Sequence, residues 1–135
     1  MQEIVYILGA LRVFYTSAHW RSKGALFYQN HLLFARLYES LDDEVDALVE
    51  LIIGFNGDSS FVEPKVFNDG VQAYTPSGND DAQGNLSKSL ALEETLLERI
   101  STLTEEDVST GIYNQLANIA ENHTRNLYLI KQTLR

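Results

Sequence analysis

The sequence contains no cysteine among its 135 residues. This absence excludes a disulfide scaffold, a thiolate zinc site and a cysteine nucleophile, so any metal site must be built from histidine and carboxylate side chains. Basic residues are also few, because 10 Lys and Arg stand against 19 Asp and Glu and the formal net charge is −9. They form no run of three, whereas binding to a phosphate backbone needs a basic stripe. Direct binding to nucleic acid is therefore not expected.

A membrane-spanning or secretory segment is not evident either. The N-terminal segment MQEIVYILGALRVFYTS carries Glu3 and Arg12 and lacks a small-residue cleavage pattern, so it predicts neither a signal peptide nor a membrane span. We therefore expect a cytoplasmic protein. The length and the 44% hydrophobic content predict a single domain over residues 1–135 with one hydrophobic core.

Proline is scarce, and both prolines lie between residues 55 and 85 together with several glycines. Such a segment is typical of a long connection, in which the apolar piece Phe61–Tyr74 predicts one or two turns of helix. Elsewhere apolar residues recur with helical spacing. This periodicity predicts four helices, over residues 3–21, 25–53, 86–103 and 107–133.

The ends of these helices carry recognisable signals. Gly24 supplies a residue that tolerates the left-handed conformation between the first two helices, and Gly54 is expected to end the second. Residues 104–107 read as a weak capping box before the fourth helix. Short, long and short connections then predict that the second and third helices run parallel, because only the long connection can cross the bundle. The predicted fold is all-α, a ferritin-like four-helix bundle with a long crossover.

Candidate ligands gather on the second predicted helix and just before it. On one continuous helix Asp46 and Glu50 would lie about 60° and about 100° from His31, hence on one side, yet Asp46 would be roughly 22 Å further along the axis. Two antiparallel copies about a two-fold axis would bring His31 of one chain to Asp46 and Glu50 of the other. His19 would lie beside His31 across the hairpin. This ligand set suits iron, zinc or manganese, although the same residues also fit helix capping and a solvated face.

The stretch from His19 to Glu50 contains His19, Trp20, Gly24, Phe27, His31, Phe34, Leu37, Tyr38, Leu41, Asp46 and Glu50. These residues resemble, position for position over about 32 residues and without a gap, the signature of the DNA-protection-during-starvation (Dps) mini-ferritins. The end of the fourth predicted helix, Asn126 to Ile130, is also similar to that family.

The resemblance implies a homo-oligomer with a two-fold interface through the second helix, usually a dodecameric shell, that oxidises Fe(II) between subunits and stores the ferric product. It implies that His19 and His31 are ligands from one chain, that Asp46 and Glu50 are ligands from its partner, and that Trp20 lies beside them. Where the family has a further Asp ligand, this chain has Ala35, which cannot coordinate a metal. We therefore expect a weakened ferroxidase centre.

Two other departures from the family follow from the sequence. The family members that bind DNA use a basic tail, and none is evident here. His123 lies on the apolar stripe of the fourth helix, where it is interpreted as a satisfied core histidine; the competing interpretation is a ligand that joins Glu93 or Glu94 in a site within the bundle, but Ala120 stands where such a site needs a Glu.

Three hypotheses remain at this point. The first is an iron-binding cage protein with a reduced ferroxidase centre. The second is a non-enzymatic assembly or binding protein that keeps the fold and the interface but has lost the chemistry, with a structural zinc or manganese site as an intermediate case. The third is an unrelated regulatory helical bundle, which a monomeric protein would favour.

Overall fold

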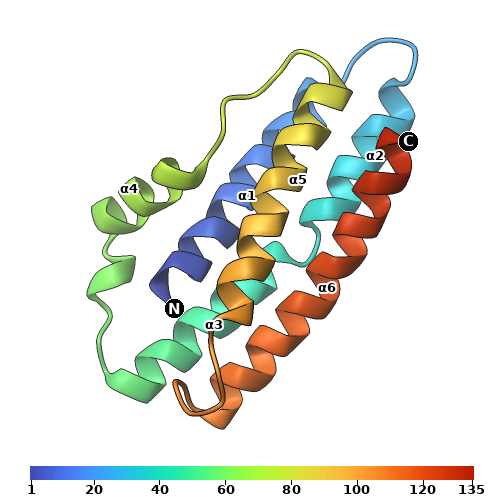
Figure 1. Ribbon diagram of the computed structural model, residues 1–135. Coiled ribbons are helices and arrows are strands. Elements are labelled where there is room, and N and C mark those ends of the chain that lie inside the picture. The colour runs from blue at the N-terminus through green and yellow to red at the C-terminus, as the bar shows by residue number, and fades with distance from the viewer.

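The computed structural model describes all residues 1–135 and is helical, without strands (Figure 1). The all-α prediction is therefore confirmed. The elements in chain order are α1 (Gln2–Arg21), α2 (Phe27–Tyr38), α3 (Leu41–Asn56), the 3-10 turn η1 (Ser60–Val62), α4 (Pro64–Tyr74), α5 (Ala82–Ser101) and α6 (Thr110–Leu134).

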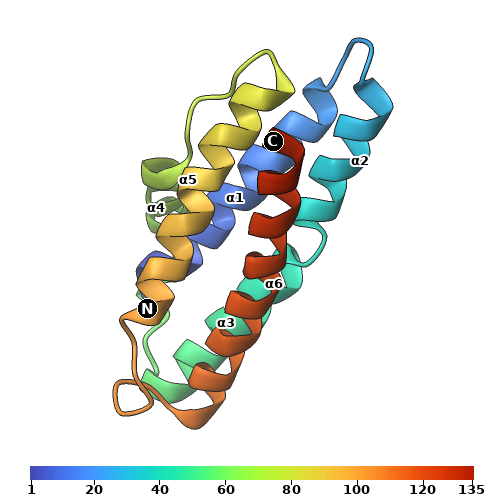
Figure 2. The same ribbon diagram turned by 45° about the vertical axis from the view of Figure 1, so that its right-hand side comes forward.

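Four rods form a bundle, with α2 and α3 following one another as a single rod (Figures 1 and 2). The first helix packs against α2, α3 and α5, and α6 packs against α5 and α3. In Figure 1, α1 and α6 run upward, whereas α2, α3 and α5 run downward. Each rod is thus antiparallel to its neighbours, and the rod formed by α2 and α3 is parallel to α5, the direction predicted from the connection lengths.

The second predicted helix is not continuous, which corrects the prediction of one helix over 25–53. Two residues, Glu39 and Ser40, separate α2 from α3, with φ, ψ of −61°, −30° and −93°, −8°. Gly54 does not end α3 either. The helix continues to Asn56, and Gly57 ends it in the left-handed conformation (φ 74°), where its N–H donates to the Ile53 carbonyl at 2.7 Å.

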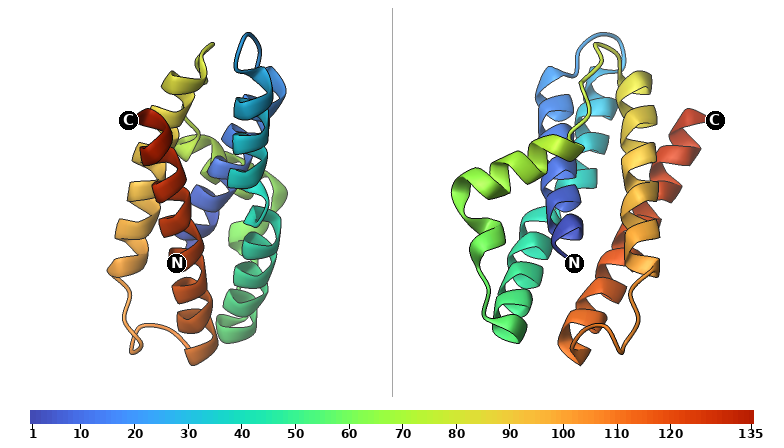
Figure 3. Two further views of the ribbon diagram at one scale, coloured as in Figure 1. Left: turned by 90° about the vertical axis from the view of Figure 1, so that its right-hand side faces the viewer. Right: turned by 60° about the vertical axis from the view of Figure 1, so that its left-hand side comes forward.

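The crossover between α3 and α5 contains the predicted short helix, which is confirmed as η1 and α4. Pro64 occupies the first turn of α4, and the Glu63 side chain accepts hydrogen bonds from the first amide groups, as expected at a helix N-terminus. This helix lies on the outside of α1 (Figure 3). The two helices approach at glycines: a Cβ added to Gly9 would lie 2.6 Å from Val71, and one added to Gly70 would lie 2.7 Å from the Tyr6 ring.

The last two helices begin at side-chain caps that the sequence prediction missed. Asp81 accepts a hydrogen bond from the Gly84 amide at the start of α5, and Ser109 accepts one from the Ile112 amide at 3.3 Å at the start of α6. The predicted starts at 86 and 107 are therefore corrected to 82 and 110. Asp107 bonds instead to the Thr104 amide at 2.9 Å within the connecting turn.

Between the rods lies one hydrophobic core, built from 23 buried apolar residues of the four rods and of the connections between them. The largest fully buried side chains include Tyr15, Phe34 and Phe61. No helix combines the length and apolar character needed to cross a bilayer. Interrupting this core is a group of buried polar residues that includes Glu44, Glu93 and His123.

Candidate functional site

Two of the predicted ligands, His19 and His31, meet across the α1–α2 hairpin. Their rings stack with centroids 3.7 Å apart and planes 17° from parallel. His19 Nδ1 lies 2.7 Å from the His31 carbonyl, and His31 Nδ1 lies 2.9 Å from the His19 carbonyl. Because a carbonyl only accepts, each Nδ1 must carry a proton, so that in the neutral ring the free lone pair lies on Nε2.

Hydrogen bonds of this kind, from one ring nitrogen to a carbonyl, are common at histidines that bind metals. A histidine that binds a metal through one nitrogen normally donates the other N–H to a carbonyl or carboxylate, which fixes the tautomer and the ring orientation. Both rings are half-buried, and neither Nε2 makes a hydrogen bond within the chain. The pair can therefore offer two nitrogen ligands on neighbouring rings.

Two aromatic side chains contact the imidazole pair. Phe27 stacks on His31 with ring centroids 5.0 Å apart, and Tyr38 meets the His19 ring edge-on at 5.5 Å. Trp20 is 74% exposed and Tyr28 is 69% exposed, with Leu26 and Leu32 also exposed nearby in the sequence. Exposed large apolar residues next to one another commonly mark a contact surface.

The predicted carboxylate ligands lie elsewhere in the same chain. Asp46 and Glu50 are both exposed on α3, beyond the break that separates α3 from the helix of His31. Asp46 lines a cavity of about 400 Å³ between α1, α3 and α4. No group of three or more His, Asp or Glu side chains within the chain is placed to hold a metal ion. Within one chain the structure therefore brings the two histidines together and leaves both carboxylates apart from them.

A second polar cluster lies inside the bundle around His123, whose side chain is fully buried. Its Nδ1 lies 2.6 Å from Glu93 Oε2 and its Nε2 lies 3.1 Å from Glu44 Oε1. Tyr15 donates its hydroxyl to Glu93 Oε1 at 2.6 Å. Each of the four rods thus contributes one ionisable side chain. The interpretation of His123 as a satisfied core residue is confirmed, and Glu93 rather than the exposed Glu94 is its partner.

The charges in this cluster follow from its geometry. Burial alone lowers the pKa of His123, but hydrogen bonds and charges from Glu44 and Glu93 outweigh burial and raise the pKa to about 10. His123 is therefore an imidazolium at neutral pH and donates to both carboxylates. Burial and the adjacent Glu93 raise the pKa of Tyr15 well above its usual value, so the phenol stays protonated.

The same geometry does not create a metal site in the bundle core. The two carboxylates bind opposite nitrogens of one ring and therefore do not converge on a common point. One atom remains without a partner, Oε2 of Glu44, which is buried and makes no hydrogen bond. A buried carboxylate oxygen left unpaired lowers the stability of the fold. The cluster of two carboxylates and one imidazolium therefore contributes less to stability than fully paired groups would.

Sequence reasoning missed Glu44 and Tyr15 in this cluster. The position of Glu44 could have indicated the cluster. Glu44 lies three residues after Leu41 and four before Leu48, on the apolar stripe of its helix. A charged residue on an apolar stripe is seldom buried unless it is paired. The sequence prediction rested on the exposed pair Asp46 and Glu50 instead.

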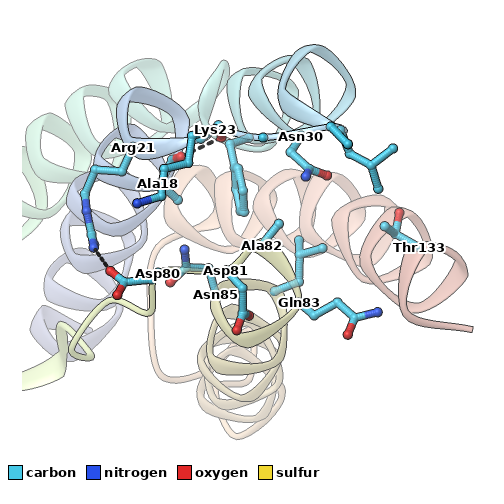
Figure 4. A pocket seen from close by; sticks show the side chains of 16 residues that line it. Ala18, Arg21, Lys23, Asn30, Asp80, Asp81, Ala82, Gln83, Asn85 and Thr133 are labelled. Atoms are coloured by element: carbon cyan, nitrogen blue, oxygen red, sulfur yellow. Dashed lines mark hydrogen bonds and ion pairs between the residues drawn. The ribbon is translucent and has the colours of Figure 1, made fainter.

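The largest cavity, about 670 Å³, opens at the α1–α2 end of the bundle (Figure 4). Arg21 and Lys23 line it together with Asp80 and Asp81 from the start of α5. Arg21 Nη2 pairs with Asp80 Oδ1 at 2.9 Å. Charges of both signs compensate one another there, and none of the four predicted ligands lines the cavity.

Comparison with known proteins found no matching family model, and neither a curated protein nor a solved structure matches the chain at a significant level. The function is therefore inferred from the chain's own residues and geometry.

Proposed function

We propose that this chain is a ferritin-like protein of the Dps type that binds Fe(II) at composite sites between two-fold-related copies and oxidises it slowly. Each site combines His19 and His31 of one copy with Asp46 and Glu50 of the other. The imidazole pair carries the proposal, because main-chain carbonyls hold both Nδ1 atoms and leave both Nε2 atoms available to a metal.

The bundle topology supports the ferritin-like class. Every rod is antiparallel to its neighbours, and a long crossover that carries α4 connects two parallel rods (Figure 1). A four-helix bundle with one long crossover is the arrangement of ferritin-like folds. It also differs from a simple up-down-up-down bundle, which needs only short connections.

A second copy of the chain is the partner that the site requires. One chain holds no group of three ligands, whereas a two-fold axis repeats every contact and supplies the missing carboxylates twice per dimer. The apolar side chains exposed near the histidines in the sequence, Trp20 and Tyr28 among them, offer a surface for that contact. Closed assembly of such dimers into a dodecameric shell completes the proposal.

The chemistry expected at this site is the oxidation of Fe(II) as substrate, with dioxygen or hydrogen peroxide as the oxidant. Two imidazoles and two carboxylates suit iron, and they also accept zinc or manganese. Ala35, one helical turn after His31 on α2, provides no ligand where a fifth would bind. The iron at each site is therefore held by fewer protein ligands, and slower oxidation is expected.

Ala35 also favours a second candidate function, a non-enzymatic assembly protein that keeps the two-fold interface without the oxidation. That protein would form the same dimer or shell. It would bind no metal at the histidine pair, and a chelator would leave its stability unchanged.

Aerobic addition of Fe(II), followed by the absorbance of the ferric product, tests the first candidate. We expect oxidation above the rate in buffer, and about two Co(II) ions bound per dimer when Co(II) replaces iron in a titration without turnover. His31→Ala should abolish both. Gln29→Ala, an exposed position on the same helix, is the matched control and should change neither.

The two candidates predict opposite results in this experiment. Oxidation at the background rate, together with equal Co(II) binding by the wild-type protein and His31→Ala, would contradict the iron site. A dimer or larger shell found under those conditions would favour the assembly protein. A monomer would contradict both, because the composite site needs two chains.

A further inference from the structure

The break between α2 and α3 is not caused by a helix-breaking residue. Glu39 and Ser40 are neither glycine nor proline, the residues that usually end or kink a helix. Their backbone angles are close to helical, and strong helix formers such as Leu37 and Leu41 flank them. Ser40 and the acidic residues in the first turn of α3 are a local signal for a new helix start. Groups that lie elsewhere in the chain also contact the two helix ends at this point.

Asn126 on α6 supplies one of those groups. Its side-chain amide donates to the Leu37 carbonyl at 3.2 Å and to Glu93 Oε1 at 3.3 Å. Leu37 lies in the last turn of α2, where main-chain carbonyls lose their helical partners and need another donor. Asn126 is 4% exposed, so no water can easily replace it. The Asn126 amide thus provides a hydrogen-bond donor for a main-chain carbonyl at the end of α2.

His123 holds the other side of the break. Its Nε2 donates to Glu44 Oε1 at 3.1 Å, and the same oxygen accepts the Ser40 hydroxyl at 2.7 Å. His123 precedes Asn126 by three residues and therefore lies on the same face of α6. One face of α6 consequently binds the last turn of α2 and the first turn of α3 at once.

We propose that Asn126 and His123 are positioning residues that hold the break between α2 and α3 and so set how α2 presents His31 relative to Asp46 and Glu50 on α3. This role rests on the proposed function in one respect, because the two half-sites matter only if a second copy joins them. The break itself is independent of any metal. Polar contacts from α6 fix the orientation of α2 relative to α3.

The orientation of α2 relative to α3 matters because one two-fold contact between copies must form both composite sites at once. The same α2–α3 rod provides the histidine at one end and the carboxylates at the other. A change in the bend moves one half-site relative to the other, in both copies, so both composite sites lose their geometry together. Ligands displaced by about 1 Å already weaken a metal site or its reaction strongly.

The distance between two spin labels, one on α2 and one on α3, measures the orientation of the two helices directly. The chain has no cysteine, so Gln29→Cys on α2 and Gly54→Cys on α3 place labels at two chosen positions only. A Cβ at Gly54 meets nothing within 4 Å, and position 29 is exposed. One straight helix would separate these residues by about 38 Å. Dilution with unlabelled protein suppresses distances between copies.

Asn126→Ala is the principal variant in this measurement, and Ser40→Ala is a milder second variant that removes only one hydroxyl. We expect both to shift or broaden the distance distribution, Asn126→Ala more, while circular dichroism confirms a folded helical protein. Asn118→Ala, at an exposed position of the same helix, should leave the distribution unchanged. In protein without labels, Asn126→Ala should weaken Co(II) binding at least tenfold, with the stoichiometry retained at saturation.

An unchanged distance in folded Asn126→Ala and Ser40→Ala would overturn the inference, whatever the metal does. A shifted distance with wild-type Co(II) affinity would overturn the positioning role. Failure of the wild-type protein to bind Co(II) would instead overturn the proposed function, and a distance shift would then still support the role of Asn126 in holding the break. The two failures are therefore distinguishable.

Discussion

The three histidines of this chain occupy two opposite environments. His19 and His31 are half-buried at one end of the bundle, and each uses one ring nitrogen in a hydrogen bond and keeps the other free. His123 is fully buried and uses both nitrogens, between Glu44 and Glu93. Histidine at the hairpin thus keeps one nitrogen free to bind a ligand, whereas histidine in the core uses both nitrogens and serves as a structural cation.

The difference shows where charge belongs in this fold. At the hairpin the hydrogen-bond partners are neutral carbonyls, which hold each Nδ1–H and leave Nε2 as the nitrogen that can bind a cation. In the core the partners are carboxylates, which keep the imidazole protonated and remove its capacity to bind metal. Substitution of the core histidine should therefore act directly on stability and on metal binding only through the break between α2 and α3, whereas substitution at the hairpin should act directly on metal binding.

Removal of the core histidine is the strongest test of this contrast. In His123→Ala the two carboxylates of Glu44 and Glu93 lose their only cationic partner inside the core. Breaking a buried ion pair by deleting one partner typically costs about 3–5 kcal/mol, because the remaining charge stays buried. Urea denaturation of the purified variant should show a loss of that size. A loss below about 1 kcal/mol would mean that the cluster is not charged as described.

A pH titration of stability tests the same cluster with a smaller effect. The folded pKa of His123 is about 10, above the ordinary value of 6.5 that applies to the unfolded chain. Below pH 6.5 both states hold the proton and the stabilisation is fully present; between 6.5 and 10 only the folded state holds it. Stability should therefore fall as pH rises, by at most about 1.4 kcal/mol per unit.

Denaturation at pH 7.5 and 8.5 measures this slope below the range in which lysines and tyrosines titrate. His123→Gln provides the control, since it keeps a polar side chain of similar length and has no proton to lose. The slope should be present in the wild-type protein and absent in the variant. Equal slopes in the two proteins would show that another group causes the pH dependence.

Much of the fold was predictable because local signals agree with it. Apolar spacing placed the helices, Gly24 marked the hairpin, where it adopts a φ of 92°, and the connection lengths indicated the parallel pair. The sequence prediction missed the break at Glu39 and Ser40, although Ser40 and the acidic residues after it are a helix-start signal. The contacts of an amide and an imidazole from α6 with the two helix ends could not be predicted, because these groups are more than 80 residues away in sequence from the break.

The candidate sites divide in the same way. The pairing of His19 with His31 followed from a short hairpin, which places residues on either side of it close together. The burial of Glu44 depended on the face that α3 turns toward α6, and the helical count from His31 did not carry across the break. That Asp46 and Glu50 complete a site stays a prediction, because it depends on a second chain.

The smallest expected effect on stability is at the hairpin, and it completes the contrast. His31→Ala removes a half-buried ring that stacks on His19 and Phe27 and one hydrogen bond to the His19 carbonyl. A typical hydrogen bond contributes about 1 kcal/mol, and a partly exposed carbonyl can bond to water instead. The free energy of unfolding in urea, measured without metal, should therefore fall by only about 1 kcal/mol, while Co(II) binding is lost. A loss as large as that of His123→Ala would show that the imidazole pair is part of the structural core, and the contrast between the hairpin histidines and the core histidine would not hold.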